Sequence, residues 1–150
     1  STVHTNDAVG AITRLKDLKV EPFLLASSVR AVVAQRLVRK LCGTCREPVQ
    51  ADASMAALLG MEAGAVIWRA KGCEACGGTG FKGRIGVFEA IRVDETVRQA
   101  IYAGADEAAI ARHAFSSGPT LAASARAMVR DGVTSAEEAI RISRYDDADG

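Results

Sequence analysis

The four cysteines of this 150-residue sequence fall into two Cys-x-x-Cys pairs, Cys42 with Cys45 and Cys73 with Cys76. A Cys-x-x-Cys turn places two thiolates on one small knuckle, and two such knuckles complete the tetrahedral sulfur shell that zinc prefers. Four cysteine ligands leave no coordination position open, so the zinc ion would be structural and not catalytic. The pattern predicts one structural Zn²⁺ ion held by all four thiolates.

Three other interpretations of the cysteines exist: a thioredoxin-like redox pair, disulfides, or four free thiols. A lone Cys-x-x-Cys motif would leave them open, whereas two pairs favour zinc and a reducing cytoplasm over secreted disulfides. Residues 46–72 separate the pairs, a longer gap than in compact zinc ribbons, so a small subdomain must fill it. Gly43, Gly72 and Gly77 suit a backbone that turns tightly around a metal.

Other groups give weaker signals. His4 lies among Thr2, Thr5 and Asn6, and by itself this indicates a hydrogen-bonded turn histidine. The glycine-rich residues 77–83 do not form a phosphate-binding P-loop, because Gly and not Ser or Thr follows the lysine. A cluster of basic residues fits a solvated face, or contact with an acidic neighbour, better than a nucleic-acid site; it comprises Arg36, Arg39, Lys40 and Arg46.

The composition is that of a soluble globular protein. Hydrophobic residues make up 49% and charged residues 25% of the sequence, and the net charge is +1. This mix excludes a disordered tail, and no apolar run approaches the roughly 20 residues of a membrane helix. Residues 1–6 are polar and show no signal-peptide pattern. Because the sequence lacks an initiating Met, we expect it to be part of a longer protein.

Apolar spacing and capping residues predict the elements that must position these groups. Helices are expected at 7–19, 24–30, 54–59, 94–104, 106–118, 120–132 and 134–143. Asn6 or Thr5 is the expected cap of the first helix, and Thr134 with Glu137 forms the expected capping box of the last. Strands are expected at 65–70 and 85–93, with a strand end at 1–5. Residues 31–41 fit either a helix or a strand, and the polar tail 144–150 is expected to fray.

Three segments, residues 1–15, 20–42 and 72–89, together resemble the type II secretion and type IV pilus assembly ATPase superfamily. Ser1-Thr2-Val3-His4-Thr5-Asn6 resembles the family's His box, usually written Ser-Thr-Leu-His-Thr-Asn. The third segment contains Gly-Cys-Glu-Ala-Cys and ends in Gly-Arg-Ile-Gly-Val-Phe-Glu. Val3 and Phe81 depart from the usual Leu and Tyr, and Ser124-Ala125 stands where the family has Asp-Gly. The sequences of residues 8–11 and 20–23 resemble those of the type II secretion branch more than those of the pilus extension ATPases.

The resemblance implies a hexameric motor that hydrolyses ATP with Mg²⁺ and drives pseudopilus assembly. Such a motor is cytoplasmic and held peripherally at the inner membrane by secretion platform proteins. His4 matches the histidine that lies near the terminal phosphate and helps to set up hydrolysis. Arg14 and Arg84 match arginines at the nucleotide or subunit interface, which suits the bidentate pairing of guanidinium with phosphate. By the same resemblance, residues 31–41 are a strand of a RecA-like sheet.

The expected fold class is α/β. Residues 1–41 would be the end of a RecA-like ATPase domain, 42–80 a tetracysteine zinc-binding subdomain that contacts inner-membrane partners, and 81–150 a mostly helical C-terminal subdomain. Phosphoryl transfer needs a phosphate cradle, its lysine and a carboxylate that holds Mg²⁺, and none is recognisable here. We therefore expect the longer protein to be an ATPase and this chain alone to be inactive. The alternatives are a type IV pilus assembly ATPase, or an autonomous zinc module that binds proteins or nucleic acid; the His box favours the motor.

Overall fold

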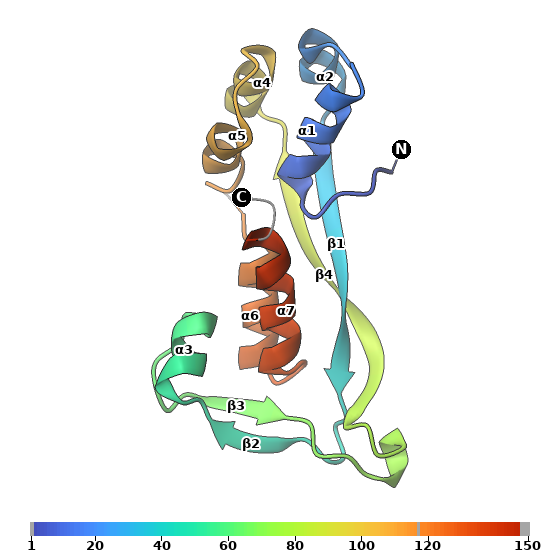
Figure 1. The fold of residues 1–150 in the computed structure, drawn as a ribbon, viewed down its shortest axis with the longest axis vertical. Coiled ribbons are helices and arrows are strands. Elements are labelled where there is room, and N and C mark those ends of the chain that lie inside the picture. The colour runs from blue at the N-terminus through green and yellow to red at the C-terminus, as the bar shows by residue number, and fades with distance from the viewer. Residues whose placement is uncertain (1, 117, 148–150) are drawn as a thin grey trace. The chain divides into compact units, whose positions relative to one another are not determined.

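The computed structural model describes residues 2–116 and 118–147, with side chains up to 143. The chain divides into two compact units, one formed by Ser1–Gln35 and Phe88–Thr120, the other by Arg36–Val87 and Leu121–Gly150. Strands β1 (Ala31–Leu41) and β4 (Phe81–Arg92) form a two-stranded sheet (Figure 1), and each strand has residues in both units. They are antiparallel, because the amide of Val93 donates to Arg30 O near one end and that of Cys42 to Gly80 O near the other. Residues 31–41 are thus a strand.

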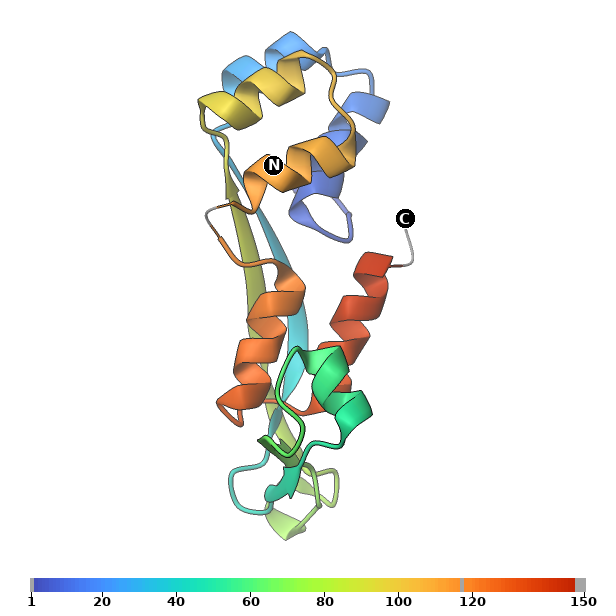
Figure 2. The same cartoon turned by 90° about the vertical axis from the view of Figure 1, so that its left-hand side faces the viewer.

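The first unit contains helices α1 (Ala8–Asp17), α2 (Pro22–Ser28), α4 (Glu95–Tyr102) and α5 (Glu107–Ala114). Figure 2 shows these four helices grouped together beside the first residues of β1. Their apolar faces meet in one core with the last residues of β4. The fully buried members of this core are Ala8, Ile91, Ile101 and Ile110.

Aspartates begin three of these helices. Asp7, Asp94 and Asp106 each accept a hydrogen bond from the backbone amide three residues later, which satisfies one of the unpaired amides at a helix start. The last two caps confirm the expectation, but a cap at Asn6 or Thr5 was wrong. The hydroxyl of Thr5 donates instead to Asp7 O. Residues 2–5 are a loop and not a strand end, while Ser1 lies outside the described residues.

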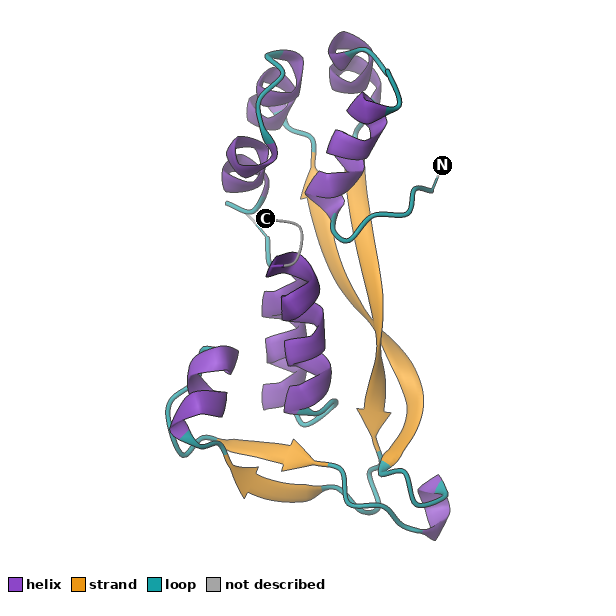
Figure 3. Ribbon diagram, in the orientation of Figure 1, coloured by secondary structure: helices purple, strands orange, loops and turns teal. Residues whose placement is uncertain are grey.

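In its described residues, the second unit holds a small two-stranded sheet, three helices and a 3₁₀ turn (Figure 3). Strands β2 (Glu47–Gln50) and β3 (Val66–Arg69) pair antiparallel, with Glu47 opposite Arg69 and Gln50 opposite Val66. Helix α3 (Ala53–Leu59) lies between them in sequence, and the 3₁₀ turn η1 (Glu74–Cys76) follows. Helices α6 (Leu121–Arg130) and α7 (Ala136–Asp147) complete the unit and pack against each other. The fold is a mixture of helices and small antiparallel sheets, with a helical final part.

Several expected boundaries differ from the structure. Strand β4 begins at Phe81 and not at 85, α2 begins at Pro22, and α5 ends at Ala114, short of Gly118. Helix α7 begins at Ala136 and continues through 147, so its backbone includes the first residues of the tail that we expected to fray. Residues 148–150 lie outside the described part of the chain. Among the described residues, none of the helices combines the length and the apolar content needed to cross a bilayer.

Candidate metal centre and histidine loop

The two cysteine pairs come together in the second unit. Their four Sγ atoms all lie within 4.8 Å of one another. The Cys42–Cys73 and Cys45–Cys76 sulfur distances are both 3.9 Å, and the Cys73–Cys76 distance is 3.8 Å. Tetrahedral zinc with Zn–S bonds of about 2.3 Å would space its sulfurs by about 3.8 Å. All four cysteines are free, so the donor set fits a tetrahedral metal ion without any disulfide.

Tight backbone turns bring each pair to the cluster. In the first knuckle, the amides of Cys45 and Arg46 both donate to Cys42 O. In the second, Gly77 adopts the left-handed conformation with φ of 63°. A Cβ at Gly72, whose φ is 104°, would overlap the carbonyl oxygen of Gly78. The second knuckle therefore requires its glycines, whereas a Cβ at Gly43 would meet no atom within 4 Å, so the expected need for glycine there was wrong.

The protein environment shifts the pKa values of three of the thiols in different directions. Burial opposes ionisation of Cys76, but hydrogen bonds from the amides of Cys73 (3.2 Å) and Gly80 (3.1 Å) lower its pKa to about 6. A hydrogen bond from the Thr44 amide lowers the pKa of Cys42. Burial raises the pKa of Cys45 to about 11. The thiolate is the form that binds a metal ion. The environment therefore favours this form at Cys42 and Cys76, whereas Cys45 needs a nearby cation to ionise.

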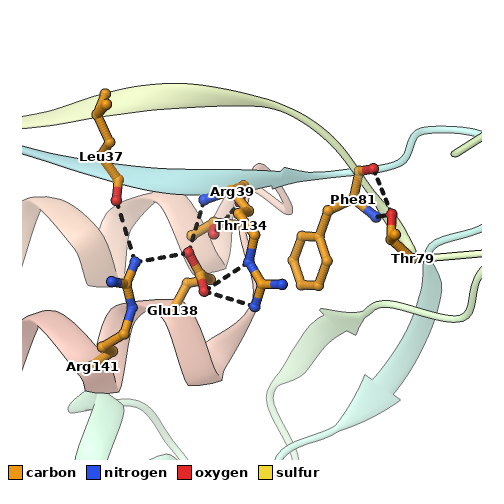
Figure 4. A network of polar contacts seen from close by, with 7 residues as sticks. All are labelled: Leu37, Arg39, Thr79, Phe81, Thr134, Glu138 and Arg141. Atoms are coloured by element: carbon orange, nitrogen blue, oxygen red, sulfur yellow. Dashed lines mark hydrogen bonds and ion pairs between the residues drawn. The ribbon is translucent and has the colours of Figure 1, made fainter.

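A polar network fixes the end of β1, which leads directly into the first knuckle (Figure 4). Glu138 on α7 is only 4% exposed, and its carboxylate accepts bonds from the Arg39 amide (2.8 Å) and guanidinium (2.9 and 3.1 Å). Arg141 donates both to Glu138 and to Leu37 O, and the hydroxyl of Thr134 donates to Arg39 O. The expected capping box was therefore wrong, because Thr134 binds the strand and not its own helix.

Two arginines of the basic cluster also stack on aromatic rings. The guanidinium of Arg39 lies 4.1 Å from the ring centroid of Phe81, and that of Arg46 lies 4.5 Å from the ring of Trp68. Arg46 also donates to the carbonyl oxygen of Gly132. The expected contact of this cluster with an acidic neighbour is confirmed at Arg39. Arg46, the residue that follows Cys45, connects the first knuckle to Trp68 in β3 and to the turn after α6.

Glu138 should make the stability of the chain depend on pH. Burial raises its pKa, but bonds from the Arg39 amide and guanidinium and the charge of Arg141 outweigh this effect and lower it below the usual value. The stabilisation is therefore present above the unfolded pKa, about 4.3, and is lost as pH falls through the lower folded pKa. We expect Glu138→Gln to reduce the free energy of unfolding by about 2 kcal/mol at pH 7 and to flatten its decline in acid.

Urea unfolding at pH 7 and at several acidic pH values measures both effects. Glu137→Gln is a matched control, because this neighbour on α7 is exposed and should change stability by less than about 0.5 kcal/mol. Parallel pH curves for the wild type and Glu138→Gln would show that Arg39 and Arg141 do not favour the ionised carboxylate.

The predicted nucleotide residues lie in both units. His4 is exposed in the loop before α1, and its imidazole has no hydrogen-bond partner among the described residues, contrary to the turn histidine expected from its neighbours. Arg14 on α1 and Arg84 on β4 are exposed, and neither guanidinium has a partner in the described ranges. His4 and Arg14 belong to the first unit, whereas Arg84 and the four cysteines belong to the second.

Two buried carboxyl groups were not predicted from the sequence. Besides Glu138, Glu89 on β4 is only 3% exposed, and its Oε1 lies 2.6 Å from the amide nitrogen of Ala8. These two partners are 81 positions apart, so no local spacing could have indicated their contact. The alternation of apolar residues along 85–93 did place Glu89 on the same side of the strand as Val87 and Ile91, which is the one available signal.

Comparison with known proteins is consistent over nearly the whole chain. A sequence model of the family described as type II/IV secretion system protein matches residues 1–141. Type II secretion system protein E of Pseudomonas aeruginosa is 47% identical over 146 residues, covering 96% of this chain and 29% of that protein. Type II secretion system ATPase E of Vibrio cholerae is 41% identical, with the same coverage of both chains.

A more distant relative, Type IV pilus assembly ATPase PilB of Thermus thermophilus, is 39% identical over 145 residues, which cover 93% of this chain and 16% of PilB. The chain thus spans less than a third of the length of these three relatives. The residues matched by the family model include both cysteine pairs and His4. The chain belongs to the family of type II/IV secretion system proteins.

Proposed function

We propose that this chain is a C-terminal portion of the cytoplasmic ATPase that powers type II protein secretion. The observation that carries the proposal is the identity of 41–47% to type II secretion proteins along 96% of the chain, one of which is named an ATPase. In the longer protein, ATP hydrolysis would drive pseudopilus assembly. Type IV pilus assembly is the second candidate, because PilB is 39% identical.

In this proposal the tetracysteine cluster holds a structural zinc ion through Cys42, Cys45, Cys73 and Cys76. Sulfur separations of 3.8 and 3.9 Å and two thiols with lowered pKa support it. Zinc would have a structural role and no catalytic one, because four thiolates leave no coordination position for a substrate. The protein's own contribution is to hold the knuckles: the Glu138 network fixes β1 before the first, and glycines shape the second.

The proposed domains follow the same logic. Residues 1–41 would complete a RecA-like ATPase domain, 42–80 would form the zinc-binding subdomain, and 81–150 would form the helical subdomain. The extended strand at 31–41 and the helical content of residues 95–147 are compatible with this division, although α4 and α5 belong to the first compact unit and α6 and α7 to the second. The zinc-binding subdomain would contact the inner-membrane platform, and the motor would act as a hexamer at the cytoplasmic face of that membrane, with no nucleic-acid partner.

His4 would act at the nucleotide, with Arg14 and Arg84 at the nucleotide or at a subunit interface. ATP bound with Mg²⁺ would supply the phosphoryl group whose transfer to water releases the driving free energy. An exposed imidazole without an internal partner is able to orient a water molecule or to contact a phosphate oxygen. The two exposed guanidinium groups are likewise free to neutralise phosphate charge.

The proposal predicts that the 150-residue chain alone does not hydrolyse ATP. It has no P-loop, so nothing cradles the phosphates or places a lysine beside them. Mg²⁺-dependent phosphate release should be at least about a hundredfold below that of a longer protein containing this chain, because positioning supplies most of the catalysis. Nucleotide affinity, measured by calorimetry, should be weak. A rate that copurifies with the chain and vanishes on His4→Ala would contradict this division of labour.

A further inference from the structure

A buried carboxyl group connects strand β4 to the start of α1 in the first unit. Glu89 is only 3% exposed and Ala8 is fully buried, and the Glu89 Oε1 to Ala8 N distance is 2.6 Å. A carboxyl group buried without a partner would be costly, so its hydrogen bonds constrain the residues that make them. The contact therefore holds the first residue of α1 at a defined place on the strand.

The start of α1 needs such an acceptor. The first amides of a helix have no partner within the helix, and their partial positive charge favours carboxyl groups. Asp7 satisfies the amide of Gly10 at 2.6 Å, and Glu89 satisfies that of Ala8. Asp7 comes from the same segment of chain and can only shape the helix end, whereas Glu89 comes from β4 and fixes where that end lies.

The constraint extends to the histidine. Ala8 follows His4 by four residues, and the Thr5 hydroxyl donates to Asp7 O at 3.0 Å, which restricts the loop between them. His4 itself has no hydrogen-bond partner among the described residues. The position of its imidazole therefore depends on where the loop is attached, and a displacement of Ala8 would be transmitted to it through four peptide units.

We propose that Glu89 is a positioning residue for His4, acting through the hydrogen bond to the first amide of α1. This inference rests on the proposed role of His4 in hydrolysis. A purely structural Glu89 would affect the amount of folded protein and not the turnover of what is folded. A positioning Glu89 would lower turnover while leaving the Michaelis constant for ATP nearly unchanged, and it would do so only while His4 is present.

Glu89→Asp is the decisive variant, because it keeps the carboxyl group but shortens the side chain by one methylene. In the full-length protein we expect turnover per folded molecule to fall about tenfold, since small misplacements of a catalytic group are costly, with the Michaelis constant changed less than about twofold. Glu89→Gln retains the length and an acceptor oxygen, so it should stay within about threefold of the wild type.

A double variant and a matched control complete the kinetic test. Adding Glu89→Asp to His4→Ala should lower turnover no further, because residues that act as one unit are not additive. Glu107→Gln should leave turnover unchanged: this exposed carboxylate of the same unit binds the Thr13 side chain of α1 and not its first amide. An undiminished turnover in Glu89→Asp, or an equal fall with and without His4, would overturn the inference.

NMR spectra of the backbone amides of the 150-residue chain test the positioning role of Glu89 separately from the proposed function. Glu89→Asp should shift the amide resonance of Ala8 and those of residues 3–6, and Glu107→Gln should not. If these resonances move but His4→Ala leaves turnover normal, the proposed function of His4 fails while the contact stands. If they do not move while His4→Ala abolishes turnover, the positioning role of Glu89 is wrong and the proposed function survives.

Discussion

Replacing Cys73 by serine is expected to abolish stoichiometric zinc and to lower the melting temperature of the chain by at least about 10 °C, because structural zinc contributes directly to the free energy of folding. Cys73 lies 3.9 Å from Cys42 and 3.8 Å from Cys76, so its loss opens the sulfur shell toward both knuckles. Without the metal ion, Cys45 would be protonated, because burial disfavours its thiolate unless a cation is adjacent.

Elemental analysis of protein produced with zinc supplied, together with calorimetry, measures both effects. The wild type should contain one zinc ion per chain. Thr44→Ser is a matched control in the first knuckle, because its exposed side chain is not a ligand and its backbone amide, which bonds Cys42, is retained. If Cys73→Ser kept its metal and its melting temperature, the four sulfurs would have to be assigned another role.

The four-cysteine cluster was predictable because its signal is local in each half. Two Cys-x-x-Cys pairs define two knuckles, and the tetrahedral preference of zinc then requires them to meet, whatever residues 46–72 do. The need for glycine at Gly72 was predictable for the same reason, since the backbone turns there against Gly78. Where the sequence pattern contained the complete physical requirement, the predicted and observed structures agree.

Predictions from local sequence patterns were wrong where a residue makes its contact with a residue distant in sequence. Thr134 and Glu137 have the spacing of a capping box, but Thr134 donates to Arg39 O in β1. Strand β2 was not predicted, because Glu47–Gln50 is short and contains a proline, and its conformation depends on pairing with β3. The buried carboxyl groups of Glu89 and Glu138 find partners 81 and 99 positions away. Such contacts follow from the fold and are not visible in any window of sequence.

His4→Ala in the full-length protein should lower ATP turnover by about 10- to 100-fold, the range expected when a group that assists proton transfer or orients water is removed. The affinity for ATP should change less than about twofold, because the proposed role concerns hydrolysis and not ground-state binding. Turnover, nucleotide affinity and melting temperature should be measured on one preparation. His113→Ala is the control, since this second histidine is exposed on α5 of the same unit.

The rival interpretation, a structural histidine, makes the opposite prediction. It requires lost stability, with activity falling only in proportion to the folded fraction. The structure opposes it, because an exposed imidazole with no hydrogen-bond partner in the described residues has little to contribute to folding. Truncation of such a side chain should change the free energy of unfolding by less than about 0.5 kcal/mol. A fall in turnover at an unchanged melting temperature therefore supports catalysis by His4, and normal turnover per folded molecule rules it out.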